Sequence, residues 1–156
     1  MQLLGLLARP TRDIDVVALV EEANLVPLEA LPGPLQRAVE DTADVFRLPR
    51  GSFNAGPRSL MDLGLPEGVL NRAHRRDWGG LILQIADRRD QIFFKLYAAV
   101  EQGPRSKHIE DLRRLKPTAD ELRAGAAWAR THDPSVAFRV ELRGALRDLG
   151  IVDGDI

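Results

Sequence analysis

From residue 88 to near its end, the chain spaces its apolar residues as amphipathic helices do. Apolar side chains recur three or four positions apart, and Gly, Pro or capping residues separate the segments. Thr118 and Glu121 have the spacing of a capping box, in which each side chain accepts a hydrogen bond from the other residue's backbone amide. The pattern predicts four helices, over about residues 88–102, 106–115, 118–130 and 133–149.

The first part of the chain has shorter and more varied elements. Leu3 to Leu7 has helical spacing, and the helix should end at Arg9–Pro10 because proline disfavours helical geometry in the residue before it. Residues 11–19 alternate and predict a strand that places Asp13 and Asp15 on one face. Helical spacing also marks residues 35–48 and 58–63, and a short apolar run predicts a buried strand over 81–85.

Together these elements predict an α/β fold with a small mixed sheet in residues 1–87 and a mainly helical part in residues 88–156. The length of 156 residues corresponds to a single domain. We expect Ile14, Val16 and Val17 to lie inside the main sheet.

Composition and charge exclude some classes of function for this protein. Twenty-two Lys and Arg against 23 Asp and Glu give a net charge of −1, so any site for a polyanion must be local. The absence of cysteine excludes disulfides, thiolate nucleophiles and cysteine-ligated zinc. No apolar run reaches the roughly 20 residues of a membrane span, so we expect a cytoplasmic protein without a membrane partner.

The strongest chemical signal is the pair of carboxylates at Asp13 and Asp15. Two acids at i and i+2 of a strand lie on the same side, with Cα atoms roughly 6 to 7 Å apart. Mg²⁺ is a hard ion that one or two carboxylates often hold, with waters and substrate phosphates completing the shell. The alternative is two solvent-facing acids on an edge strand.

A lysine in apolar surroundings gives a second signal. Lys95 lies among Ile92, Phe93, Phe94 and Leu96, where an unpaired charge is costly to desolvate. We therefore expect a buried or half-buried carboxylate partner. The alternative is a lysine whose stem covers the helix surface while its ammonium group reaches solvent.

Several segments resemble one family. Residues 11–16 resemble the D-x-D strand of the polymerase-beta-like nucleotidyltransferase superfamily, and more narrowly that of bacterial nucleotidyltransferase-like proteins grouped with AbiEii-type toxins of toxin–antitoxin systems. Further resemblance lies in loop segments at 48–49, 53–57 and 64–68, in a lysine-bearing helix at 90–99, and in an acidic stretch at 106–112 and 116–118.

The resemblance implies transfer of a nucleotidyl group from an NTP to a hydroxyl of RNA or protein. It implies that Asp13 and Asp15 bind Mg²⁺, that Lys95 contacts the nucleotide phosphates or the catalytic carboxylates, and that Asp111 belongs to the same cleft. From the residues alone, Asp111 and Glu110 are equally consistent with acids on a solvated helix face. A cognate antitoxin or regulatory protein is a further implied partner.

Two features depart from an active member of that superfamily. No Gly-Gly or Gly-Ser turn precedes the D-x-D strand, and Leu3 to Leu7 resembles the second half of the helix that such a turn would begin. We therefore expect the domain to be incomplete at its N-terminus. Gln84 is the only polar residue of the run 81–85, where a third carboxylate is expected, and a neutral amide cannot serve as a general base.

These departures motivate a second hypothesis, in which the chain is a non-catalytic relative that binds a partner in a toxin–antitoxin or regulatory pair. A basic cluster formed by Arg72, His74, Arg75 and Arg76, followed by Trp78, is a candidate contact for an RNA acceptor. The alternative for this cluster is a solvated charged loop that Trp78 anchors to the core.

Overall fold

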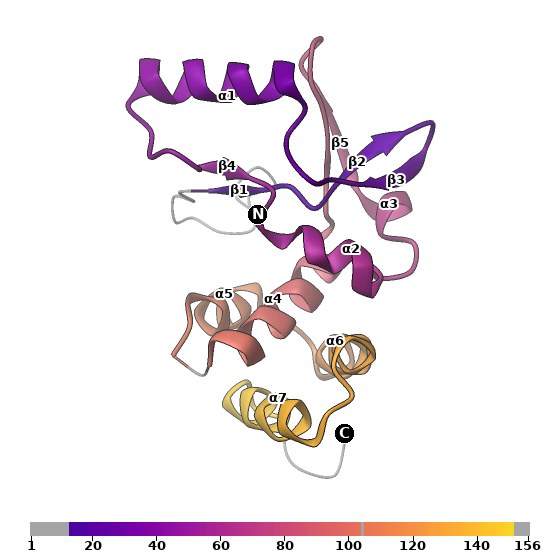
Figure 1. Cartoon of the computed structure of the whole chain (residues 1–156). Coiled ribbons are helices and arrows are strands. Elements are labelled where there is room, and N and C mark those ends of the chain that lie inside the picture. The colour runs from indigo at the N-terminus through magenta and orange to yellow at the C-terminus, as the bar shows by residue number, and fades with distance from the viewer. Residues whose placement is uncertain (1–12, 104, 152–156) are drawn as a thin grey trace. The chain divides into compact units, whose positions relative to one another are not determined.

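The computed structural model describes residues 13–103 and 105–151, which form seven α-helices and three two-stranded sheets (Figure 1). The predicted α/β class is confirmed. The predicted helix over Leu3 to Leu7 lies outside the described residues. The described residues divide into two compact units, which we call the first unit (residues 13–65) and the second unit (residues from Pro66 onward). Within the two described ranges, no helix has the length and apolar character needed to cross a membrane.

The first unit contains short strands and one long helix. Its elements are β1 (Ile14–Asp15), β2 (Ala18–Glu21), β3 (Asn24–Pro27), α1 (Gly33–Phe46), β4 (Phe53–Asn54), the 3-10 helix η2 (Gly56–Arg58) and α2 (Ser59–Leu63). Strand β1 pairs in parallel with β4 and places Asp15 opposite Asn54. Strands β2 and β3 form an antiparallel hairpin.

The strand predicted over residues 11–19 is divided in two. Among the described residues of this stretch, from 13 onward, Ile14 and Asp15 pair with β4, and the ladder ends where the Val16 amide donates to the Asn54 carbonyl. The next segment forms β2, which pairs with β3 instead of β4. The expectation that Ile14 is interior is wrong, because its side chain is 40% exposed. The two-residue ladder of β1 and β4 is too narrow to cover it.

The second unit contains a hairpin and the helices. Its elements are α3 (Val69–Arg72), β5 (His74–Asp77), β6 (Ile82–Ile85), α4 (Arg88–Gln102), α5 (Lys107–Leu115), α6 (Ala119–His132) and α7 (Val136–Asp148). All four helices predicted from residue 88 onward are confirmed. The capping box of Thr118 and Glu121 is present, and the hydroxyl of Ser135 accepts a hydrogen bond from the Phe138 amide to start α7.

The strand predicted over 81–85 exists as β6, but it is not buried. It pairs antiparallel with β5, whose side chains are all exposed, and Ile82 is itself 51% exposed. The alternative in which Trp78 anchors a charged loop is also wrong. Residues 74–77 are a strand, and Trp78 at the hairpin turn is 56% exposed.

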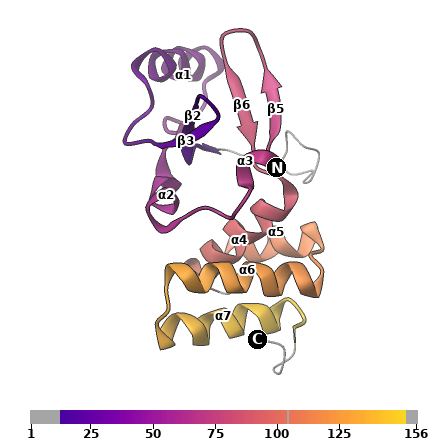
Figure 2. The same cartoon turned by 90° about the vertical axis from the view of Figure 1, so that its right-hand side faces the viewer.

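The core of the second unit lies between the four long helices. Figure 2 shows α4, α6 and α7 as successive layers, and α4 contacts each of the other three helices. The largest apolar side chains with almost no exposed surface come from all four of these helices: Ile92, Leu96, Ile109, Leu112, Leu122, Leu142 and Leu146. Helix α4 therefore serves as the central element of this unit.

Two helical glycines should respond oppositely to substitution. A Cβ at Gly125 would lie 3.1 Å from Phe93 Cδ1 in the α4–α6 contact, whereas a Cβ at Gly144 would meet no atom within 4 Å. We expect Gly125→Val to lower the free energy of unfolding by about 1–3 kcal/mol through overpacking. Gly144→Ala should raise it by roughly 0.5–1 kcal/mol. Urea unfolding of both variants checks this, and equal stability of Gly125→Val and the parent chain would contradict it.

Candidate functional site

The carboxylate of Asp15 is held by a side chain from the neighbouring strand. Asn54 Nδ2 donates a hydrogen bond to Asp15 Oδ1 at 3.1 Å, across the parallel pair of β1 and β4. Asp15 is exposed to solvent, and Asp13 directly precedes β1 with a partly exposed side chain. The two predicted metal ligands therefore lie in the first unit, within one short stretch of chain.

This donor set fits a cation that needs few protein ligands. Within residues 13–103 and 105–151, no group of three or more acidic or histidine side chains is arranged to hold a metal ion. Mg²⁺ commonly takes one or two carboxylates and retains several waters or substrate phosphates. Asp13 and Asp15 match that requirement, because carboxylate oxygens are the ligands that this hard ion prefers.

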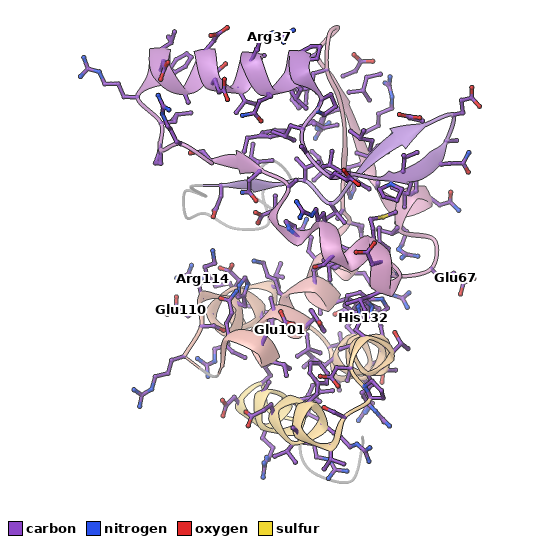
Figure 3. All side chains as sticks on the ribbon, in the orientation of Figure 1. Arg37, Glu67, Glu101, Glu110, Arg114 and His132 are labelled. Atoms are coloured by element: carbon purple, nitrogen blue, oxygen red, sulfur yellow. The ribbon has the colours of Figure 1, made fainter. Side chains whose placement is uncertain are left out.

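Lys95 was expected to have a carboxylate partner, and in the structure that partner is Asp111. The distance from Lys95 Nζ to Asp111 Oδ2 is 2.7 Å, and the two side chains are 17% and 1% exposed. The expectation of a carboxylate partner is confirmed, and the alternative of Asp111 on a solvated face is wrong. Glu110 does lie on that face, where it pairs with Arg114 at 3.6 Å (Figure 3). Contact of Lys95 with nucleotide phosphates stays a prediction.

The four predicted site residues therefore fall in two groups. Asp13 and Asp15 belong to the first unit, while Lys95 and Asp111 connect α4 with α5 in the second. The structure brings Lys95 and Asp111 into direct contact.

A half-buried ion pair that the sequence did not reveal joins α3 to α4. Asp90 has no exposed surface, and Arg72 donates to both of its oxygens, from Nε at 3.1 Å and from Nη2 at 2.6 Å. The hydrogen bond to Asp90 raises the pKa of Arg72 above its ordinary value, against the effect of burial. The sequence pattern places Asp90 on a helix but does not predict this pair, because Arg72 lies 18 residues away.

Much of the basic cluster ahead of Trp78 is also paired internally. Arg72 is held by Asp90, His74 Nε2 lies 3.1 Å from Asp87 Oδ2, and Arg75 contacts Asp77 at 2.6 Å. These acids balance the local positive charge, which weakens the attraction of the cluster for a polyanion. The predicted RNA contact stays a prediction.

Arg88 joins the end of α5 to the start of α6. Its Nη2 donates to the carbonyls of Leu115 at 2.8 Å and Lys116 at 3.1 Å, and its guanidinium pairs with Glu121. Burial raises the pKa of Glu121, but hydrogen bonds from Arg88 and the Thr118 amide outweigh it, and the pKa lies below its ordinary value. Arg88 thus satisfies backbone carbonyls at the end of α5 as well as the capping carboxylate of α6.

Removing the ammonium group of Lys95 should be costly. Lys95→Met removes the cationic group that lies 2.7 Å from the buried carboxylate of Asp111, so we expect a loss of about 3–5 kcal/mol in the free energy of unfolding. The double variant Lys95→Met/Asp111→Leu should recover much of that loss, because the buried carboxylate is removed together with its cationic partner. Glu110→Gln, which removes an exposed ion pair, should change stability by less than about 1 kcal/mol. Urea unfolding distinguishes these cases, and a loss for Lys95→Met as small as for Glu110→Gln would contradict the interpretation.

Glu121 should make stability depend on acid pH. Its folded-state pKa lies below the ordinary value of 4.5, so its stabilising effect is fully present above that value. The effect is lost as pH falls through the folded-state pKa. The stability advantage of the parent chain over Glu121→Gln should therefore be largest near neutral pH and shrink below pH 4.5. Thermal unfolding across this range measures it, with Glu141→Gln on α7 as the control, and a constant advantage would refute the expectation.

Comparisons were made with family models, curated proteins and solved structures. None of them matches this chain.

Proposed function

We propose that the chain is a Mg²⁺-dependent nucleotidyltransferase, which binds an NTP through Asp13 and Asp15 and transfers its nucleotidyl group to a hydroxyl of RNA or protein. The proposal is supported by the placement of Asp15 on β1, where Asn54 donates a hydrogen bond to its carboxylate. An exposed carboxylate, with a second one two residues earlier, suits a cation that must also reach substrate phosphates.

The reaction forms a bond between the acceptor oxygen and the α-phosphorus of the nucleotide. The bond between the α-phosphorus and the oxygen that bridges it to the β-phosphorus breaks, and pyrophosphate leaves. The hydroxyl proton passes to solvent water. Bound Mg²⁺ supplies charge neutralisation of the triphosphate and orientation of the α-phosphorus. Asp13 and Asp15 contribute negative charge and oxygen ligands at the start of β1.

Lys95 and Asp111 have a structural role in this proposal. Because Lys95 Nζ is already bound to Asp111 at 2.7 Å, a phosphate would have to compete with a buried carboxylate for it. Separating the pair would take the close cationic partner away from a carboxylate that is 1% exposed, which is unfavourable. We therefore place the chemistry on Asp13 and Asp15.

One observation favours the second hypothesis, in which the chain binds a protein partner without catalysis. Among residues 13–65, Leu28 and Leu60 are the buried apolar side chains, while Val45 and Phe46 on α1 are 75% and 70% exposed. A unit with so little buried apolar surface gains little stabilisation from its own core. Contact with a partner would supply more.

Titration calorimetry tests the enzyme proposal directly. The parent chain should bind Mg²⁺ alone, and it should bind at least one NTP when Mg²⁺ is present. Asp15→Asn and Asp13→Asn should each weaken Mg²⁺ binding by at least about 10-fold. Asp62→Asn, an exposed acid on α2 of the same unit, should leave it unchanged.

Two results would count against the enzyme. An absence of heat with Mg²⁺ and with every NTP would overturn the proposal and favour the partner-binding alternative. Equal Mg²⁺ affinity of Asp15→Asn and the parent chain would remove Asp15 from the site.

A further inference from the structure

The side-chain amide of Asn54 makes three contacts. Its Nδ2 donates to Asp15 Oδ1 at 3.1 Å and to the Gly51 carbonyl at 3.2 Å, and its Oδ1 accepts from the Gly56 amide at 2.7 Å. Two of these three partners are backbone groups of the segment that contains β4. The third is the carboxylate that we propose as a metal ligand.

The backbone partners fix which way the amide faces. A backbone N–H can only donate and a carbonyl can only accept, so Gly56 requires the oxygen of Asn54 and Gly51 requires its nitrogen. The reversed amide would lose both of these bonds. Asn54 therefore presents an N–H group to Asp15 as a consequence of the local backbone.

The contact also determines how Asp15 can present its charge. Asp15 is exposed, and without Asn54 its carboxylate would rotate in solvent. The hydrogen bond engages Oδ1 and leaves Oδ2 available for a cation. Outer partners of this kind orient metal-ligating carboxylates and commonly change metal affinity when they are removed.

We propose that Asn54 is a positioning residue that orients Asp15 for a divalent cation, and that Gly51 and Gly56 set its orientation. This inference rests on the proposed function, because it assumes that Asp15 is a metal ligand. It also accounts for a carboxamide at this position: a carboxylate could not donate to Asp15 or to the Gly51 carbonyl.

Gly56 provides a second way to disturb the same contact. A Cβ at this position would lie 2.6 Å from Asn54 Oδ1, closer than real Cβ contacts allow. The cheapest relief is a displacement of the Asn54 amide, because that oxygen is the end of a flexible side chain. Gly56→Ala thus shifts the amide while Asp13, Asp15 and Asn54 all stay in the chain.

The test is calorimetric titration with Mg²⁺ alone, together with thermal unfolding in the absence of metal. Asn54→Leu and Gly56→Ala should each weaken Mg²⁺ binding by roughly 10- to 100-fold. Asn71→Leu, the same substitution at an exposed site on α3, should not. In the Asp15→Asn background, Asn54→Leu should cause no further loss of affinity, because the group that it orients is no longer a carboxylate.

The outcomes separate this inference from the proposed function. If Asp15→Asn weakens Mg²⁺ binding but Asn54→Leu and Gly56→Ala do not, the positioning role is overturned and the metal site stands. If Asn54→Leu lowers affinity equally in both backgrounds, its effect is merely structural and the inference is wrong. If the parent chain binds no Mg²⁺, both fail. Should Asn54→Leu not fold, Gly56→Ala decides.

Discussion

The arrangement of the second unit depends on the pairing of the charges that α4 directs toward the neighbouring elements, in buried or half-buried positions. A buried charge without a partner costs several kcal/mol, so a central helix with charged side chains requires opposite charges from its neighbours. Partners come from α3, α5 and α6 and form three pairs: Arg88 with Glu121, Asp90 with Arg72, and Lys95 with Asp111. Apolar packing has no preferred direction, whereas each pair requires one particular placement of a neighbouring element.

The same requirement limits what the basic residues before Trp78 can do. Arg72 contributes to the sequence pattern of a basic cluster, but Asp90 at the start of α4 holds its guanidinium. Asp87, whose side chain caps α4, also contacts the imidazole ring of His74 through Oδ2. In the sequence these basic residues look available for nucleic acid. In the structure, Arg72 and His74 instead connect α3 and β5 to the start of α4.

The sequence predicted those features whose determining residues lie close together in the chain. The four long helices were predictable, because periodic apolar residues and caps such as Thr118 act within a few positions. The hairpin of β2 and β3 was not, because its turn places Glu22 and Ala23 at φ values of 47° and 66°, which Gly or Asn usually occupy. Desolvation predicted a partner for Lys95. The sequence had no comparable signal for Asp90.

The candidate metal site also includes a contact that the sequence could not predict. The spacing of Asp13 and Asp15 was enough to single them out, but Asn54 lies 39 residues away from Asp15 and was missed. Parallel pairing leaves no local signature, because its two strands are joined by a long connection. The ladder itself is short, with Ile14 N bonded to the Ser52 carbonyl and Val16 N to the Asn54 carbonyl. The hydrogen bond from the Asn54 side chain to Asp15 adds a further link between β1 and β4, so one residue contributes both to the strand pairing and to the proposed orientation of Asp15.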